Sequence, residues 1–173
     1  MGAASHNMMI LMFSVAGDNY GINVRDITEV LPTVTLKHFP GGPEYVAGLL
    51  NYRGQAVPVV DLTLLMTAQA SRNRISSRIV IVDYHHAFTY EGEAHHLLGL
   101  LIEKITETMR VPDDAFTRSG VATHETPFLG DVAIHNGVMI QVVNVNKVLP
   151  ESVKTLLFYD ARDESVIDHG TAE

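Results

Sequence analysis

Four histidines form two adjacent pairs near the middle of the sequence, His85-His86 and His95-His96. Two such pairs facing each other across a hairpin would present imidazole nitrogens to a zinc ion. Against this, no Asp or Cys completes the ligand spacing, and neighbouring residues on a strand point to opposite faces of a sheet. The histidines are therefore better explained as part of an exposed polar loop, and we expect no metal site.

Three carboxylates, Asp61, Asp83 and Glu103, are the candidates for paired acid–base chemistry. Each has a simpler role, as the cap of a short helix, the end of a strand and a solvated charge, respectively. The sequence has no cysteine, nucleophile elbow, phosphate-binding loop or glycine-rich dinucleotide turn. We therefore expect neither catalysis nor a cofactor.

Arg53 offers a different kind of chemistry, the recognition of another protein. It precedes Gly54 and stands between two largely apolar runs, 48–52 and 55–62. Gly54 permits the positive φ that a tight reversal often requires, so the pattern predicts an antiparallel hairpin with Arg53 at its tip. A charge on a rigid turn is accessible to a partner. The alternative is that Arg53 pairs with an Asp or Glu of its own domain, where an exposed pair contributes at most ~1 kcal/mol.

The composition limits what kind of partner such a surface binds. The chain of 173 residues has a formal net charge of −8, whereas nucleic acid and anionic membrane surfaces require clustered Lys and Arg. No run approaches the ~20 apolar residues that span a bilayer. Residues 1–8 lack the basic start and the apolar core of a signal peptide, and we interpret them as a leader or a cloning remnant. We expect a cytoplasmic protein.

Short β-strands dominate the pattern that positions these residues. Strand-like runs occur at 9–15, 20–24, 78–84, 97–102 and 128–145, the last around the hairpin dipeptide Asn136-Gly137. Residues 25–31 fit a single helical turn or an irregular strand, and Leu62 to Met66 fit a short helix that Asp61 caps. A polar loop is predicted from Tyr84 to His96, and an amphipathic helix at 150–159.

Two segments of the sequence recur in the same order. Residues 21–29 align with 99–107 at an offset of 78, and residues 54–62 align with 137–145 at an offset of 83. The first match includes Ile-Thr-Glu, which is polar as well as apolar. This favours duplication over the alternative that any two β segments rich in Val, Ile and Gly align this well. The repeat predicts two similar units, each a small closed or nearly closed barrel of about five strands.

The polar residues 67–77 form the expected seam between the two units. We predict a single domain of residues 9–160. In it, barrel one comprises about 9–68 together with the C-terminal helix at 150–159, and barrel two comprises about 75–149. Residues 161–173 are polar and are predicted to be a flexible tail.

In their order, several motifs resemble those of the CheW family of chemotaxis coupling proteins: Tyr20-Gly21-Ile22, Glu29-Val30-Leu31-Pro32, Pro43, GLLNYRG at 48–54 and VPVVDL at 57–62. The match runs from about Met9 to Phe158 and is more specific in its first half. The resemblance implies an all-β fold of two SH3-like five-stranded barrels, without catalysis. It implies two partners, the cytoplasmic tip of a methyl-accepting receptor and the regulatory domain of a CheA-type sensor histidine kinase, with the adaptor recruited to membrane receptor arrays.

The same resemblance indicates which residues contact these partners. The implied set comes from the hairpin turn and from the Glu-Val-Leu-Pro segment, and it comprises Asn51, Arg53, Gly54, Ile27, Glu29 and Val30. An apolar groove between the barrels would hold the tip of the receptor hairpin.

Two features depart from the family pattern. The segment from Tyr84 to His96 is longer than the hairpin expected there, and Asn144 stands where the second unit often has Asp. We expect Asn144 still to cap the turn that follows it. Together with the motifs Val30-Leu31-Pro32 and Pro40-Gly41-Gly42-Pro43, the long segment is similar to that of adaptors of Wsp-type surface-sensing pathways, whose output is a diguanylate cyclase. The alternative from another functional class is a ligand- or metal-binding β-barrel protein.

Overall fold

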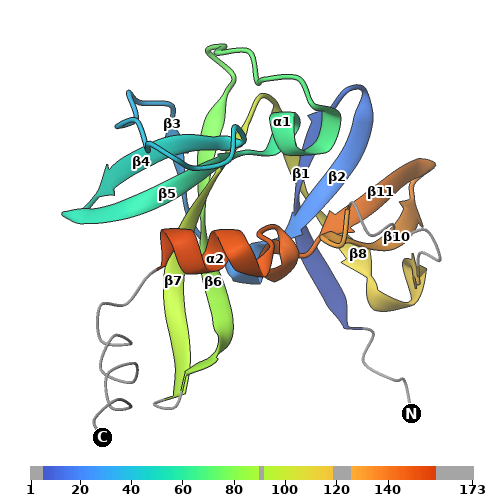
Figure 1. The fold of residues 1–173 in the computed structure, drawn as a ribbon. Helices are drawn as coiled ribbons and strands as arrows, with labels where there is room; N and C mark the ends of the chain where they lie inside the picture. Colours follow the sequence, from blue (N-terminus) through green and yellow to red (C-terminus); the bar gives the residue numbers. More distant parts are fainter. Residues whose placement is uncertain (1–5, 90–91, 119–125, 159–173) are drawn as a thin grey trace, which may run out of the picture.

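The computed structural model describes residues 6–89, 92–118 and 126–158, and short β-strands make up most of them (Figure 1). The expected tail at 161–173 lies outside the described residues, as do residues 1–5 of the expected leader. The strands are β1 (Asn7–Val15), β2 (Asp18–Asn23), β3 (Ile27–Pro32), β4 (Val46–Tyr52), β5 (Gln55–Asp61), β6 (Arg78–Thr89), β7 (Gly92–Ile102), β8 (Ile105–Pro112), β9 (Phe116–Thr117), β10 (Leu129–His135) and β11 (Val138–Val143). The helices are α1 (Leu62–Thr67) and α2 (Glu151–Leu157), with single 3-10 turns η1 (Val24–Asp26), η2 (Asp113–Ala115) and η3 (Val145–Lys147).

The strands form two sheets. One has the order β8-β1-β2-β11-β10-β9 and the other the order β3-β6-β7-β5-β4. Neighbouring strands are antiparallel except for the pairs β2–β11 and β5–β7, which are parallel. This confirms the predicted all-β fold with two SH3-like β subdomains, although in the described part of the chain neither strand order closes on itself.

The two parallel pairs show how the sequence repeat is built into the sheets. Val59 pairs with Gly99, and Val142 pairs with Gly21. These two pairs are related by the offsets found in the sequence, so the repeat is confirmed. Each sheet, however, combines strands of both repeats. In the six-stranded sheet β1 and β2 lie with β8, β9, β10 and β11, whereas in the five-stranded sheet β6 and β7 lie with β3, β4 and β5.

The division into one barrel of 9–68 and another of 75–149 is therefore wrong. An alignment of two repeats shows which strands are alike, but it does not show which strands share hydrogen bonds. In the structure β1 pairs with β8 and β2 pairs with β11, so both strands of the first repeat are hydrogen-bonded to strands of the second. Exchange of strands across the seam ties the two sheets into one structure.

One apolar core joins both sheets and both helices. It contains buried side chains from β1, β6, β7, η3 and α2, including Phe13, Val80, Leu100, Val145 and Val153. Figure 1 shows α2 lying across the region where the two sheets meet. The predicted C-terminal helix is confirmed, and Val153 on its inner face is buried against this core.

At two polar segments the strands extend further than the sequence predicted, and the loop expected at the first of them is wrong. Where a loop was expected from Tyr84 to His96, β6 and β7 continue as a hairpin, with Tyr84 opposite His96 and Thr89 opposite Gly92. β1 begins at Asn7, within the expected leader, and Met8 pairs with Val111 of β8. In both places a strand extends beyond the core, so its sequence lacks the apolar alternation by which a half-buried strand is recognised.

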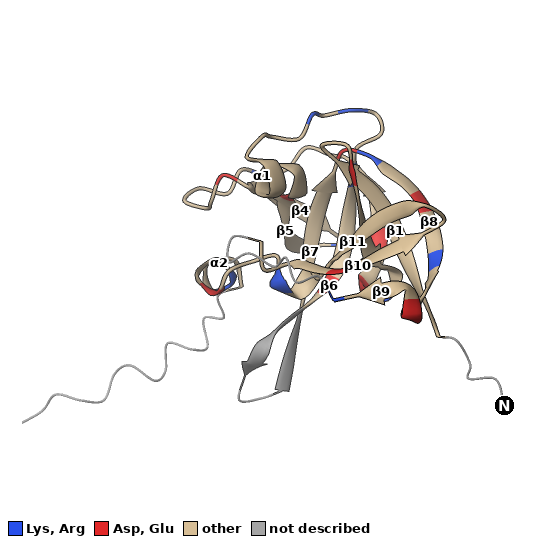
Figure 2. Ribbon diagram, turned by 90° about the vertical axis from the view of Figure 1, so that its right-hand side faces the viewer, with Lys and Arg blue, Asp and Glu red and all other residues tan. Residues whose placement is uncertain are grey.

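The connection from α1 to β6 passes over α1, and Figure 2 shows basic segments on this loop. Asp61 caps the N-terminus of α1 as predicted, since its Oδ1 accepts a hydrogen bond of 3.0 Å from the Leu64 backbone N–H. At the equivalent place in the other repeat, the Asn144 side chain accepts a hydrogen bond of 3.1 Å from the Asn146 N–H and caps η3. The predicted capping by Asn144 is therefore confirmed.

Candidate interaction site

The predicted hairpin at Arg53 is formed by β4 and β5, with Tyr52 opposite Gln55. Arg53 and Gly54 are the two residues of the connection, and their φ angles are 53° and 84°. Two consecutive positive φ values are typical of the type I′ turns that match the twist of a hairpin. The Asn51 side chain accepts a hydrogen bond of 3.0 Å from the Gly54 N–H. Asn51 and Gly54 therefore build the turn that holds Arg53.

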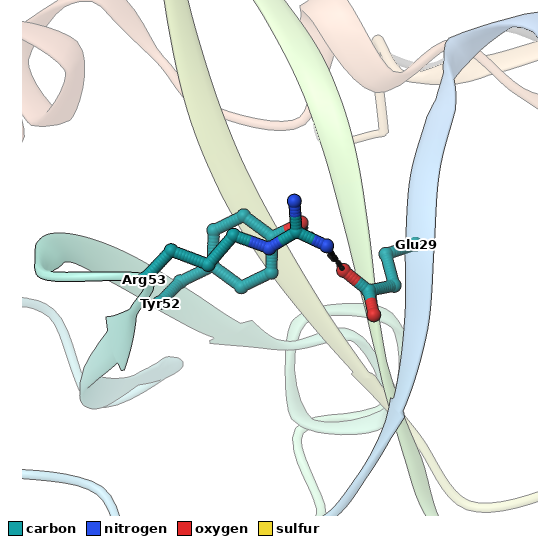
Figure 3. Close-up of polar contacts among 3 residues, drawn as sticks. All are labelled: Glu29, Tyr52 and Arg53. Atoms are coloured by element: carbon teal, nitrogen blue, oxygen red, sulfur yellow. Dashed lines mark hydrogen bonds and ion pairs between the residues drawn. The ribbon is translucent and has the colours of Figure 1, made fainter.

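Arg53 forms an ion pair with Glu29, which lies on β3 at the opposite edge of the same sheet. Its Nη2 donates to Glu29 Oε2 over 3.0 Å, and Figure 3 shows the two side chains reaching toward each other. The Arg53 side chain is 74% exposed and that of Glu29 is 35% exposed. The sequence left two interpretations of Arg53 open, and the structure contains the intramolecular pair. Because the guanidinium stays largely in solvent, its other N–H groups remain accessible to a partner.

Tyr52 completes this arrangement, and the sequence analysis missed it. Its hydroxyl donates to Glu29 Oε2 over 2.6 Å. This hydrogen bond is the main cause of a raised pKa of the Tyr52 phenol, with burial adding to it and the Arg53 charge opposing it. The Arg53 guanidinium carbon lies 5.2 Å from the centroid of the Tyr52 ring, within the range of a cation–π contact. The sequence did contain a signal for this role, because Tyr52 is a tyrosine at an inward-facing strand position directly before the turn.

These three side chains form one wall of a surface groove of about 350 Å³. Its other lining residues are mainly apolar and come from β3, the segment after it and β4: Leu31, Pro32, Val34, Leu50 and Asn51. Val34 is 51% exposed. The groove therefore combines an exposed cation, a carboxylate and apolar side chains, which is a composition suited to binding another protein.

The structure brings Glu29, Asn51 and Arg53 together, but it separates them from two other residues implied by the resemblance. Ile27 packs against the core shared by the two sheets. Val30 is 42% exposed and alternates with Glu29 along β3, so it does not line the groove. Contact of Ile27, Val30 and Gly54 with a partner remains a prediction.

The other candidates for chemistry do not converge. Asp61 is used by the α1 cap, and Glu103 accepts a hydrogen bond of 2.6 Å from the Arg72 N–H. In the backbone register His85 lies opposite His95, and the side chains of both lie outside the described residues. Among the described residues, no group of three or more His, Cys, Asp or Glu is placed to hold a metal ion.

Two β subdomains with a shared core and a mixed polar and apolar groove define a β scaffold. A family model described as "CheW-like domain" matches residues 9–153, and the chain belongs to this family. Chemotaxis protein CheW of Rhizobium meliloti is 23% identical over 143 residues, which cover 82% of this chain and 86% of that one. Protein PilI of Pseudomonas aeruginosa is 24% identical over 105 residues, covering 61% of this chain and 54% of that protein.

A solved structure has the same fold. The scaffolding protein TtCheW from Thermoanaerobacter tengcongensis superposes with a TM-score of 0.72 at 24% identity, covering 86% of this chain and 97% of that one. The resemblance to the CheW family is confirmed, and as a member of this family of noncatalytic scaffolds the chain is an adaptor and not an enzyme. The finer likeness to Wsp-type adaptors stays a prediction. Among the described residues, no helix is long and apolar enough to cross a membrane.

Proposed function

We propose that this adaptor couples the cytoplasmic tip of a methyl-accepting chemoreceptor to the regulatory domain of a CheA-type histidine kinase, in receptor arrays at the cytoplasmic side of the membrane. Membership in the CheW-like family supports this role. The observation that carries the site is the exposed Arg53 guanidinium, held by a two-residue turn and by Glu29 beside an apolar groove.

The Arg53–Glu29 pair is suited to binding a partner because it is preorganised. A free arginine side chain loses rotamer entropy when a partner immobilises it. Here Glu29 and the Tyr52 ring restrict the guanidinium before binding. The cation then offers its remaining donors to a carboxylate or a backbone carbonyl of the partner, while Val34 and Leu31 accept an apolar side chain.

Coupling also requires that the partners distinguish between signalling states. A scaffold that binds receptor and kinase equally well in both states holds them together but transmits nothing. In the proposed function, the receptor changes its contact with the adaptor on signalling, and the rigid core between the two sheets passes the change in position to the kinase.

The test measures binding and stability together. We expect Arg53→Ala to weaken binding to the purified kinase regulatory domain, or to a receptor tip fragment, by about tenfold, as measured by isothermal titration calorimetry. The melting temperature should stay nearly unchanged, because the exposed pair contributes little to folding. Asn136→Ala, at the tip of the equivalent β10–β11 hairpin, is the matched control and should bind both partners normally. Unaltered binding of both partners by Arg53→Ala would refute the assignment of the site.

A further inference from the structure

The loop between α1 and β6, which we call the basic loop (residues 71–77), presents an unusual combination of side chains. Ile75 is 99% exposed at its tip, and Arg72 and Arg74 are exposed on either side of Asn73. A fully exposed isoleucine gains nothing from folding, whereas its burial by a partner would stabilise a complex. The loop is therefore a candidate for an interaction surface.

Hydrogen bonds at both ends hold this loop in place. The Ser71 N–H donates to Asp61 Oδ2 over 2.8 Å, and the Arg72 N–H donates to Glu103 Oε1 over 2.6 Å. The Ser76 hydroxyl donates to the Glu103 carbonyl over 2.9 Å. Such a framework fixes the backbone that carries Ile75, so a partner would meet a formed surface and would not have to order it.

The Arg78 guanidinium fixes the tip itself. Its Nη1 donates to the Ile75 carbonyl over 2.6 Å and to the Ser77 carbonyl over 2.8 Å. The Ser77 hydroxyl, on a residue that is almost fully buried, donates to the Arg72 carbonyl over 3.1 Å. The tip thus exposes the Ile75 side chain while its own backbone carbonyl is satisfied within the loop.

A polar pocket of about 420 Å³ lies beside the basic loop. Arg72, Arg74 and Lys104 line it, and none of these three cations has an ion-pair partner among the described residues. The pocket wall also contains Thr63, whose buried hydroxyl has no hydrogen-bond partner within the described part of the chain. The Glu103 carboxylate lies in the same wall, but one of its oxygens already accepts from the Arg72 N–H. The pocket therefore has more cationic groups and hydroxyl donors than its own acceptors satisfy.

This concentration of positive charge occurs in a chain whose net charge is −8. We propose that the basic loop and its pocket bind an acidic protein segment that carries an apolar side chain among its carboxylates. The carboxylates would be held by Arg72, Arg74 and Lys104, and the apolar side chain would cover Ile75. Charge complementarity supplies the orientation and apolar burial supplies much of the affinity.

The charge of the whole chain favours a protein segment over other polyanions. Three cations and one isoleucine are too few to hold a protein of charge −8 on an anionic bilayer, because each basic residue near the surface adds only a modest attraction. Nucleic acid would need a longer track of cations. The surface is also separate from the proposed kinase and receptor site, because its pocket shares no lining residue with the groove at Arg53.

The test uses the full chain, isotope-labelled, and the synthetic peptide EELGEE as probe. We expect titration at low salt to shift the backbone amide NMR signals of residues 71–77 and 104. The double variant Arg72→Glu/Arg74→Glu should weaken binding by about tenfold, and Ile75→Ser should weaken it severalfold. The matched control is Arg25→Glu/Arg110→Glu, which makes the same charge change at exposed residues that do not line the pocket.

Each outcome decides the proposal. Localised shifts that both loop variants weaken and the control variant preserves would support it. Shifts spread over the surface, or equal weakening by the control variant, would show general charge attraction and overturn it. Stronger binding of the full chain to vesicles of phosphatidylserine than to the peptide, lost in the same loop variants, would assign the loop to membranes and also overturn it. Normal folding of each variant is verified from the dispersion of the same spectra.

Discussion

Tyr52 donates its hydroxyl hydrogen to Glu29 Oε2 across 2.6 Å, the same oxygen that accepts from the Arg53 guanidinium. Adjacent residues of a strand normally point to opposite faces. Here the turn at Arg53 has a positive φ of 53°, and the side chain returns over the Tyr52 ring to reach the carboxylate. One carboxylate oxygen therefore fixes both neighbours, and Tyr52 is a positioning residue of the proposed site.

Tyr52→Phe removes this hydroxyl and keeps the ring. We expect a small drop in melting temperature and a severalfold loss of affinity for the partner that binds Arg53, because the Glu29 carboxylate loses one of its two donors and positions the guanidinium less well. Calorimetric melting and binding titration measure the two effects. Tyr45→Phe is a matched control, since Tyr45 does not line the groove and the pKa of its phenol is raised by burial, without a contribution from Glu29. Unchanged affinity in Tyr52→Phe would show that the hydroxyl does not position the site.

Reversal of the Arg53–Glu29 pair separates an internal role from a role in binding. Glu29→Arg alone places two guanidinium groups together, and we expect it to lower the free energy of unfolding by less than about 1 kcal/mol, because Arg53 is largely exposed. The double variant Glu29→Arg/Arg53→Glu restores an opposite-charge pair and should regain the stability lost to charge repulsion, but not the stability that the Tyr52–Glu29 hydrogen bond supplies. If a partner recognises the Arg53 cation, the double variant will still bind poorly. Recovery of binding together with stability would show that only the internal pair matters.

The sequence predicted the local devices of this fold better than the assembly of its strands. The Arg53-Gly54 turn and the Asp61 cap are each determined by a few neighbouring residues, and both are present. The exchange of strands between the two repeats depends on pairing of residues far apart in the chain, such as Val142 with Gly21, which two similar repeats leave ambiguous. The Tyr52–Glu29 hydrogen bond was missed for the same reason, because it joins β4 to the other edge of the sheet.

Gly21 and Gly99 occupy equivalent places in the two repeats, at the parallel pairs where two strands approach closely. A Cβ added at Gly99 would lie 2.8 Å from the Val59 Cγ2, and one added at Gly21 would overlap the Ile10 side chain more severely. We expect Gly99→Ala to lower the free energy of unfolding by about 1–3 kcal/mol and Gly21→Ala to lower it more. Urea unfolding measures both.

The control for these glycines is Gly17→Ala, where an added Cβ would meet no atom within 4 Å and only the positive φ of 92° opposes the change. Gly17→Ala should lower the free energy of unfolding only by the contribution of backbone strain, about 1 kcal/mol. Equal costs at all three glycines would contradict the close-approach argument.

The phenol of Tyr84 is buried, and its hydroxyl has no hydrogen-bond partner among the described residues. Its pKa is raised, mainly by burial and further by the charge of Glu151. A folded-state pKa above the unfolded value near 10.0 means that the folded protein keeps the proton longer. Stability from this group is therefore complete below about pH 10 and falls as the pH rises above it.

Tyr84→Phe removes both the unsatisfied hydroxyl and the ionisation. At neutral pH we expect the free energy of unfolding to rise by up to about 1 kcal/mol, because the variant no longer buries this hydroxyl without a hydrogen-bond partner. Between about pH 10 and 12, the variant should lose stability less steeply than the wild type. Tyr20→Phe is the comparison: the pKa of Tyr20 is also raised, by burial and by Asp18, but Tyr20 is only partly buried, so its substitution should flatten the curve less. Urea unfolding as a function of pH gives both slopes, and an equally steep alkaline decline in Tyr84→Phe would show that other groups cause it.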